Sequence, residues 1–204
     1  MTARFELADR IKGFLSPDEG ERLHRTAALA APLGPCLEIG SYCGKSALYL
    51  GRACQEAGQV LFSIDHHRGS EEQQPGEEYF DPALYDYKAG RINTLPFFLS
   101  AISRAGLSDT VVPIVCSSAV AARSWSTPLA LVFIDGGHSL ETATSDYECW
   151  AEHIMPDGFL LIHDIFENPD EGGQAPYEIY KRALSSGFFE PHSRVKTLGV
   201  LKRN

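Results

Sequence analysis

The sequence predicts an α/β fold with a doubly wound sheet that is mostly parallel. The first observation is a set of five short apolar segments, each ending in polar or small residues: residues 36–39, 60–64, 111–115, 129–134 and 159–162. The second is a set of segments with helical character between them: residues 45–57, about 89–105, 119–125 and 140–154. Strands that alternate with helices in this way build an open parallel sheet.

The two ends of the chain add a helix before this sheet and a hairpin after it. Residues 16–19 have the Ser-Pro-x-Glu pattern of a capping box with proline at the first helical position, and an amphipathic segment continues to about residue 31. Near the C-terminus, a helix is expected over about residues 175–187. Residues 188–190 and 197–202 could then pair as an antiparallel hairpin, which would give the sheet a mixed edge.

The chain shows no linker and no internal repeat. We therefore expect residues 1–204 to form a single domain, with N-terminal helices over about residues 6–31. Residues 66–87 are rich in Gly, Pro and Glu and are too long for an ordinary connection, so we interpret them as a lid-like insertion. Pro113 interrupts the third apolar segment. Because proline cannot donate to a sheet ladder, we expect that strand at an edge of the sheet.

Composition narrows the range of partners. The formal net charge is −9, and the 18 Lys and Arg residues form no block that could follow a phosphate backbone, so nucleic acid is not expected. No apolar run reaches the roughly 20 residues that cross a bilayer, and residues 1–6 lack the apolar stretch of a secretory signal. We expect a cytoplasmic protein without a membrane partner. The oligomeric state is left open, with a homodimer as one candidate.

The turn after the first strand is the strongest functional signal. Gly40 and Gly44 lie four positions apart in it, where glycine lets a ligand approach the backbone and the next helix offers N–H groups to negative charge. Asp65 ends the second strand, where a carboxylate can accept hydrogen bonds from a ribose diol. We expect a nucleotide-containing ligand here. The alternatives are a tight turn without a ligand, and a role for Asp65 in capping the loop that follows it.

Glycine spacing separates the candidate nucleotides. A dinucleotide fingerprint aligned on Gly44 requires glycines where this chain has Ile39 and Ser41, which disfavours NAD. A phosphate-binding P-loop needs four residues between its glycines, whereas Gly40 and Gly44 have three between them. A P-loop-like nucleotide-binding protein is therefore disfavoured as well.

Several motifs resemble one known family. Residues 38–46, Glu-Ile-Gly-Ser-Tyr-Cys-Gly-Lys-Ser, resemble the first motif of class I S-adenosylmethionine-dependent methyltransferases. Further motifs are similar to a bacterial branch related to the macrolide-sugar O-methyltransferases and the cephalosporin-hydroxylase-like proteins: residues 133–139, Asp146, Trp150, residues 156–158 and residues 162–164. The resemblance covers about residues 17–202. It implies a seven-stranded Rossmann-like sheet and transfer of a methyl group from S-adenosylmethionine to a small-molecule acceptor, by O-methylation of a hydroxyl.

The resemblance also implies where the cofactor would lie. Gly40 and Gly44 would lie beside the methionine moiety, Asp65 on the ribose, and Ser117 and Ser118 near the adenine. Capping of the next helix is an alternative role for the two serines. The full set of expected cofactor contacts is Glu38, Gly40, Ser41, Gly44, Ser46, Asp65, Ser117, Ser118 and Asp135.

Two acidic residues suggest a metal site. Asp135 and Asp164 follow the fourth and fifth strands, so a parallel sheet would bring both to the edge where the cofactor lies. They could bind a divalent cation, most suitably Mg²⁺, that acidifies the acceptor hydroxyl. The metal-dependent relatives carry a second acid directly after the counterpart of Asp164, where this chain has Ile165. The site would then be completed by Glu167 or Asn168, or be absent.

Proton removal is assigned to a histidine. His138 follows two glycines and could take a proton from the acceptor at neutral pH, while Asp135 could orient His138 or the amino group of the cofactor. His163 is interpreted as a hydrogen-bonded structural group. A non-catalytic S-adenosylmethionine-binding module is the alternative function. The sequence leaves open the acceptor, the methylated atom (O, N or C) and the need for a metal.

Overall fold

The structure is a computed structural model that describes residues 5–137 and 139–204. Its longer helices are α1 (Pro17–Ala30), α2 (Lys45–Glu56), α3 (Leu95–Arg104), α4 (Ser118–Ala122), α5 (Leu140–Trp150) and α6 (Ala175–Ser185). Its strands are β1 (Cys36–Ile39), β2 (Leu61–Ile64), β3 (Tyr85–Asp86), β4 (Arg91–Ile92), β5 (Val111–Ile114), β6 (Leu129–Ile134), β7 (Ile154–Ile162), β8 (Phe189–Val195) and β9 (Leu198–Arg203). Short 3-10 helices are η2 (Ala8–Arg10), η3 (Glu71–Gln73), η4 (Pro82–Leu84) and η5 (Ala151–His153). Among the described helices, none has both the length and the apolar character needed to cross a membrane.

Seven strands form the main sheet in the order β5-β2-β1-β6-β7-β9-β8. The first five of these are parallel, and β9 pairs antiparallel with both β7 and β8. The predicted doubly wound, mostly parallel sheet with a C-terminal antiparallel hairpin is confirmed. Pro113 lies in β5, at the edge of the sheet, as its missing N–H group requires. The strand order reverses at β1, between β2 and β6.

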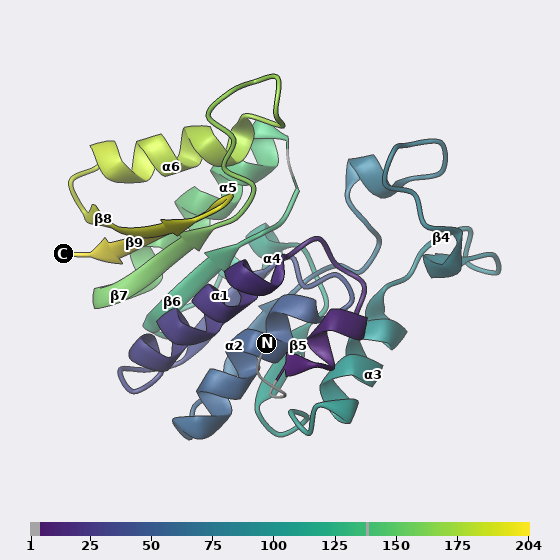
Figure 1. Cartoon of the computed structure of the whole chain (residues 1–204), viewed down its shortest axis with the longest axis horizontal. Helices are drawn as coiled ribbons and strands as arrows, with labels where there is room; N and C mark the ends of the chain where they lie inside the picture. The colour runs from purple at the N-terminus through teal and green to yellow at the C-terminus, as the bar shows by residue number, and fades with distance from the viewer. Residues whose placement is uncertain (1–4, 138) are drawn as a thin grey trace.

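The helices cover both faces of this sheet (Figure 1). Residues of α1, α2 and α3, among them Leu23, Leu50 and Phe98, pack on one face. Residues of α4, α5 and α6 pack on the other, where Trp150 is fully buried. Successive strand residues point to opposite faces, so the continuous apolar runs that predicted buried parallel strands supply both cores.

Several boundaries differ from the sequence-based expectations. The helix expected from about residue 89 begins only at Leu95, because residues 91–92 form β4, which pairs with β3. There Ile92 is buried in a small core with Leu84 and Cys43. Helix α4 ends at Ala122 and not near residue 125. Helix α5 ends at Trp150, and β7 begins at Ile154 because Ile154 pairs with Leu129 of β6. These differences depend on pairing and packing between distant residues, which local periodicity does not report.

The segment interpreted as an insertion projects from one end of the sheet (Figure 1). It contains η3, η4 and β3, and the hairpin partner β4 extends it beyond residue 87. Its two ends are joined at the base. The N–H of Thr94 donates to the carbonyl of His67 over 3.2 Å, and Thr94 Oγ1 lies 2.8 Å from His67 Nδ1. The insertion therefore starts from a fixed, buried base.

Candidate functional site

A cavity of about 490 Å³ opens at the carboxyl ends of the parallel strands. The residues that follow β1, β2, β5, β6 and β7 all contribute to its wall, among them Gly40, Asp65, Ser117, Asp135 and Asp164. This is the edge where the strand order reverses at β1, and ligands of open α/β sheets bind at such a reversal. Its volume is typical of a small-molecule site.

The structure explains why glycine occupies both positions of the turn. Gly40 has a φ of 86°, and a Cβ there would lie 2.0 Å from the carbonyl oxygen of Asp135, so no side chain fits. Gly44 has a φ of 94° directly before α2, and a Cβ there would lie 3.3 Å from the ring of Phe98. Gly40, Ser41 and Ser46 line the cavity. Gly44 is not among the described wall residues, and it sets the direction in which the turn enters α2.

Asp65 binds the turn and also the loop after β2. Its Oδ2 accepts hydrogen bonds from the backbone N–H groups of Ser41 (3.0 Å) and Tyr42 (2.8 Å). Its Oδ1 accepts one from the N–H of His67 (2.6 Å). The carboxylate is 14% exposed and lies in the cavity wall. Asp65 therefore meets the glycine turn as expected, and it also has the capping role considered as an alternative.

Glu38 lies beneath the turn, fully buried. Its Oε1 accepts a hydrogen bond from Ser63 Oγ over 2.5 Å and its Oε2 one from Ser46 Oγ over 2.8 Å. Burial raises the pKa of Glu38 to about 7, although both hydrogen bonds act in the opposite direction. Glu38 has no exposed surface, and its two hydrogen bonds join β1 to β2 and α2.

The two serines after β5 lie in the cavity wall. Ser117 precedes α4, and among the described groups its side chain makes no capping hydrogen bond. Ser118 Oγ donates to Oδ1 of Asp146, a residue of α5 that is 3% exposed and also lines the cavity. Burial raises the pKa of Asp146 to about 6. Asp146 belongs to one of the motifs that resemble the methyltransferases, but no role in the site was predicted for it.

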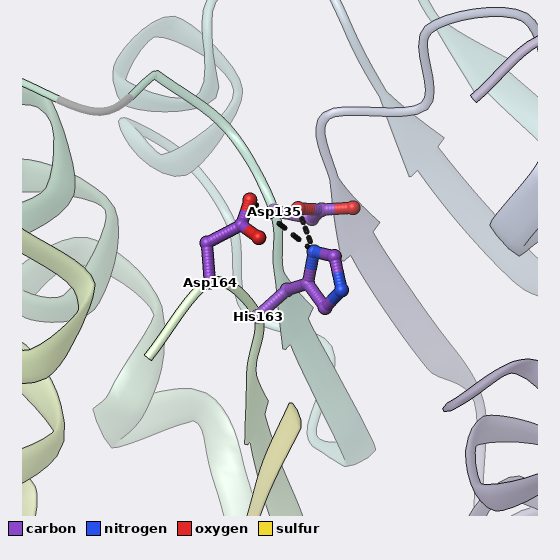
Figure 2. A group of neighbouring side chains, drawn as sticks. All are labelled: Asp135, His163 and Asp164. Atoms are coloured by element: carbon purple, nitrogen blue, oxygen red, sulfur yellow. Dashed lines mark hydrogen bonds and ion pairs between the residues drawn. The ribbon is translucent and has the colours of Figure 1, made fainter. Parts of the chain in front are cut away.

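His163 joins the two acids that follow β6 and β7 (Figure 2). Its Nδ1 lies 3.0 Å from Asp135 Oδ1 and 3.3 Å from Asp164 Oδ2, and its Nε2 lies 3.5 Å from Glu19 Oε2. Burial alone lowers the pKa of His163, but Asp135, Asp164 and Glu19 together raise it well above its usual range. These acids therefore favour the protonated form of the ring, whose Nδ1 lies between the two carboxylates.

The same group suits a divalent cation. Asp135, His163 and Asp164 offer ligand atoms that all lie within 4.8 Å of one another, and two carboxylates with an imidazole nitrogen are an ordinary donor set for such an ion. Coordination by Nδ1 requires that His163 first lose its proton there. The suggestion that Glu167 or Asn168 completes the site is not supported: in the described structure Glu167 pairs with Arg194, and Asn168 accepts from the N–H of Asp170. Among the described residues, His163 is the third member of this group.

His138, the expected proton acceptor, lies outside the described residues. Gly137 and Ser139, its neighbours in the sequence, line the cavity. Ser139 Oγ accepts from the N–H of Thr142 over 3.2 Å at the start of α5. The role of His138 stays a prediction.

Part of the cavity wall comes from residues for which the sequence predicted no individual role. Residues 12–15, from the segment before α1, and Tyr79, from the insertion, both line it. Lys12 forms an ion pair with Asp81, and the ring of Phe14 contacts the ring of Tyr79. The aromatic and acidic composition of the insertion was the available signal for Tyr79. For residues 12–15 no local motif existed.

Comparison with known proteins places this fold among the methyltransferases. A family model described as a methyltransferase domain matches residues 37–165, more than half of the chain. The chain therefore belongs to this methyltransferase family, and the sequence-based assignment to the class I methyltransferases is confirmed.

Solved structures agree on the fold. The chain is similar to an O-methyltransferase from Bacillus cereus in complex with S-adenosylhomocysteine, with 14% identity, a TM-score of 0.67 and coverage of 100% of this chain and 92% of that one. It is similar to the O-methyltransferase TomG from Streptomyces achromogenes in complex with S-adenosylmethionine, with 17% identity, a TM-score of 0.64 and coverage of 94% and 82%. For the O-methyltransferase NovP the identity is 12%, the TM-score 0.66 and the coverage 91% and 79%.

Proposed function

We propose that this chain binds S-adenosylmethionine in the cavity and transfers its methyl group to a hydroxyl of a small-molecule acceptor. The observation that carries the proposal is the meeting of the glycine turn, Asp65 and the strand-end acids around one cavity at the reversal of strand order. Membership of the methyltransferase family supports methyl transfer. The O-methyltransferases of similar fold that were solved with S-adenosylmethionine or S-adenosylhomocysteine support this cofactor and a hydroxyl acceptor.

The proposed cofactor position follows the wall of the cavity. The methionine moiety would lie at Gly40 and Ser41, where the first turn of α2 offers N–H groups to its carboxylate. The ribose would donate hydrogen bonds to Asp65, whose carboxylate reaches the cavity. The adenine would lie near Ser117 and Ser118. Glu38, Gly44 and Ser46 maintain the shape of the turn in this proposal.

The chemistry requires removal of a proton from the acceptor hydroxyl while its oxygen attacks the methyl carbon, and the sulfur leaves as the thioether of S-adenosylhomocysteine. We assign the proton to His138, with Asp135 orienting His138 or the amino group of the cofactor. Asp135 and Asp164 would hold a divalent cation, most suitably Mg²⁺, with His163 positioned between the two carboxylates. When bound, such a cation would supply positive charge that favours the ionised hydroxyl.

Calorimetric titration tests the cofactor assignment. S-adenosylmethionine and S-adenosylhomocysteine are expected to bind, whereas ATP and NAD are not. Asp65→Ala should weaken S-adenosylhomocysteine binding by about tenfold or more, because it removes hydrogen bonds to a charged acceptor. Asp86→Ala is the matched control: Asp86 also accepts from two backbone N–H groups, of Lys88 (2.9 Å) and Ala89 (3.0 Å), but outside the cavity wall. Tight ATP binding without a response to S-adenosylhomocysteine would contradict the assignment.

A second experiment separates an enzyme from a binding module. The protein is incubated with methyl-labelled S-adenosylmethionine and a small-molecule extract of its host, and labelled products are identified. His138→Ala should lower product formation strongly, while His192→Ala, which changes an exposed residue of β8, should not. Cofactor binding without any labelled product would favour the non-catalytic module. We also propose that the protein is cytoplasmic and forms a homodimer. Light scattering of the purified protein tests the oligomeric state.

A further inference from the structure

Three aromatic rings lie together at the mouth of the cavity. Phe14 precedes α1, Tyr42 belongs to the glycine turn, and Tyr79 belongs to the insertion; we call these three residues the aromatic rim. The rings of Phe14 and Tyr79 meet edge to face with centroids 5.3 Å apart, and those of Phe14 and Tyr42 are stacked at 6.1 Å. All three line the cavity and also a shallower cleft of about 410 Å³ next to it. The rim therefore forms the wall between the cavity and the outside.

The aromatic rim retains apolar surface that its own contacts do not cover. Phe14 is 64% exposed and Tyr79 is 44% exposed. A large planar side chain gains stability when another ring covers it, so these two rings can still bind a planar partner.

The rim is held from both sides. Lys12 pairs with Asp81 of the insertion, and Lys45 Nζ donates to the carbonyl of Gly13 over 3.1 Å. These contacts join the segment that carries Phe14 to the insertion and to α2. The rim is therefore already ordered before a ligand binds, so binding costs less conformational entropy.

The charge of the cavity wall selects against anions. Among the described wall residues, seven are acidic and two are lysines: Asp65, Glu71, Glu72, Asp135, Asp146, Asp164 and Glu171 against Lys12 and Lys45. Both lysines already have partners within the protein. In the protein without a bound cation, an acceptor with a carboxylate or phosphate would meet repulsion that no described wall residue is placed to relieve.

We infer that the acceptor is a planar aromatic molecule without negative charge, and that its ring stacks on Phe14 and Tyr79. This inference rests on the proposed function. Tyr42 lies between Gly40 and Gly44 in the turn, so the rim adjoins the end of the cavity proposed for the methionine moiety. An acceptor held by the rim would present its hydroxyl toward the reactive methyl group.

A set of matched probes tests the acceptor class. Each probe is titrated into protein saturated with S-adenosylhomocysteine, and binding is followed by ligand-observed NMR. The probes are 2-naphthol, the non-aromatic decahydro-2-naphthol, the anionic 6-hydroxy-2-naphthoate and the cationic 6-(aminomethyl)-2-naphthol. We expect 2-naphthol and the cationic probe to bind about threefold to tenfold more tightly than decahydro-2-naphthol. The anionic probe should bind most weakly.

Variants locate the binding to the rim. Phe14→Leu and Tyr79→Leu should each weaken 2-naphthol binding about threefold to tenfold, and Phe14→Tyr, which keeps a ring, should restore most of it. Phe188→Leu is the control, because Phe188 is 62% exposed, like Phe14, and its ring faces Arg203 away from the cavity. All four variants should bind S-adenosylhomocysteine as the wild type does, which shows that they are folded.

The outcomes distinguish this inference from the proposed function. Unaltered S-adenosylhomocysteine binding with no saturable binding of 2-naphthol, or with equal binding of decahydro-2-naphthol, overturns the aromatic acceptor alone. Tightest binding of 6-hydroxy-2-naphthoate overturns the charge argument. Failure of S-adenosylhomocysteine to bind the wild-type protein overturns the proposed function and, with it, the acceptor inference.

Discussion

Replacing Glu19 by glutamine tests how α1 is tied to the rest of the sheet. Glu19 is 3% exposed. Its Oε2 accepts from the N–H (3.0 Å) and the hydroxyl (2.7 Å) of Ser16, which completes the predicted capping box. Its Oε1 accepts from the N–H (3.0 Å) and the hydroxyl (2.8 Å) of Thr197, in the turn between β8 and β9. Glutamine has a single acceptor oxygen, so one of these donor pairs would face an NH₂ group.

The expected loss of stability follows from the pKa of this carboxyl. Burial alone would raise the pKa of Glu19, but hydrogen bonds from His163, Ser16 and Thr197 lower it from 4.5 to about 2. A shift of this size corresponds to about 3 kcal/mol of unfolding free energy. Because the pKa is depressed in the folded state, this contribution is complete well above pH 4.5 and is lost as the pH falls from about 4.5 toward 2.

Urea unfolding followed by circular dichroism measures this contribution. At pH 7 the Glu19→Gln variant should be about 3 kcal/mol less stable than the wild type, and near pH 3 the difference should fall to roughly half. Glu21→Gln is the control on the same helix. Glu21 is 42% exposed and, among the described residues, its ion pair is with Arg25 at 3.4 Å, so its replacement should change stability by less than about 0.5 kcal/mol. Equal stability of Glu19→Gln and wild type at pH 7, or a difference that does not change with pH, would refute this reasoning.

Three further substitutions test the cavity. Gly40→Ala should abolish S-adenosylhomocysteine binding and lower the free energy of unfolding by about 2 kcal/mol or more, because the new Cβ would lie 2.0 Å from the Asp135 carbonyl oxygen. Gly58→Ala is the control in thermal denaturation. Gly58 has a φ of 68° and no described atom within 4 Å of an added Cβ, so its replacement measures the backbone strain alone. Burial raises the pKa of Glu38 to about 7, so the wild type should lose stability as the pH rises from about 4.5 to 7. Glu38→Gln should lose less, because Asp146, with its pKa raised to about 6, still contributes, and urea midpoints at pH 5 and pH 8 would show the difference. Asp164→Asn keeps a side chain that tolerates the φ of 57° but removes a charged ligand. Turnover of the wild type should fall on chelation and return when Mg²⁺ is added. The Asp164→Asn variant should need a higher Mg²⁺ concentration to regain its turnover. Full turnover of the chelated wild type would exclude the metal role.

Much of the site could be placed from the sequence because it lies at strand ends. Once five parallel strands are recognised, their carboxyl ends must share one edge of the sheet. Asp65, Ser117, Asp135 and Asp164 follow strands in the sequence, and they line one cavity in the structure. Gly40 was marked because a turn of this kind needs a residue without a Cβ, and its contact with the Asp135 carbonyl supplies the reason.

The sequence by itself determined the alternation of the five parallel strands with helices, the edge position of Pro113, the capping box of α1 and the glycine turn. Each of these depends on a local pattern: an apolar period, a missing N–H group or a permitted backbone angle. Only the tertiary structure decided that Glu38 lies beneath the turn, that His163 joins Asp135 to Asp164, and that Phe14 faces Tyr79. The reason is physical: these contacts join side chains from elements far apart in the chain, and their partners are set by how helices and loops pack against the sheet, which no local pattern encodes.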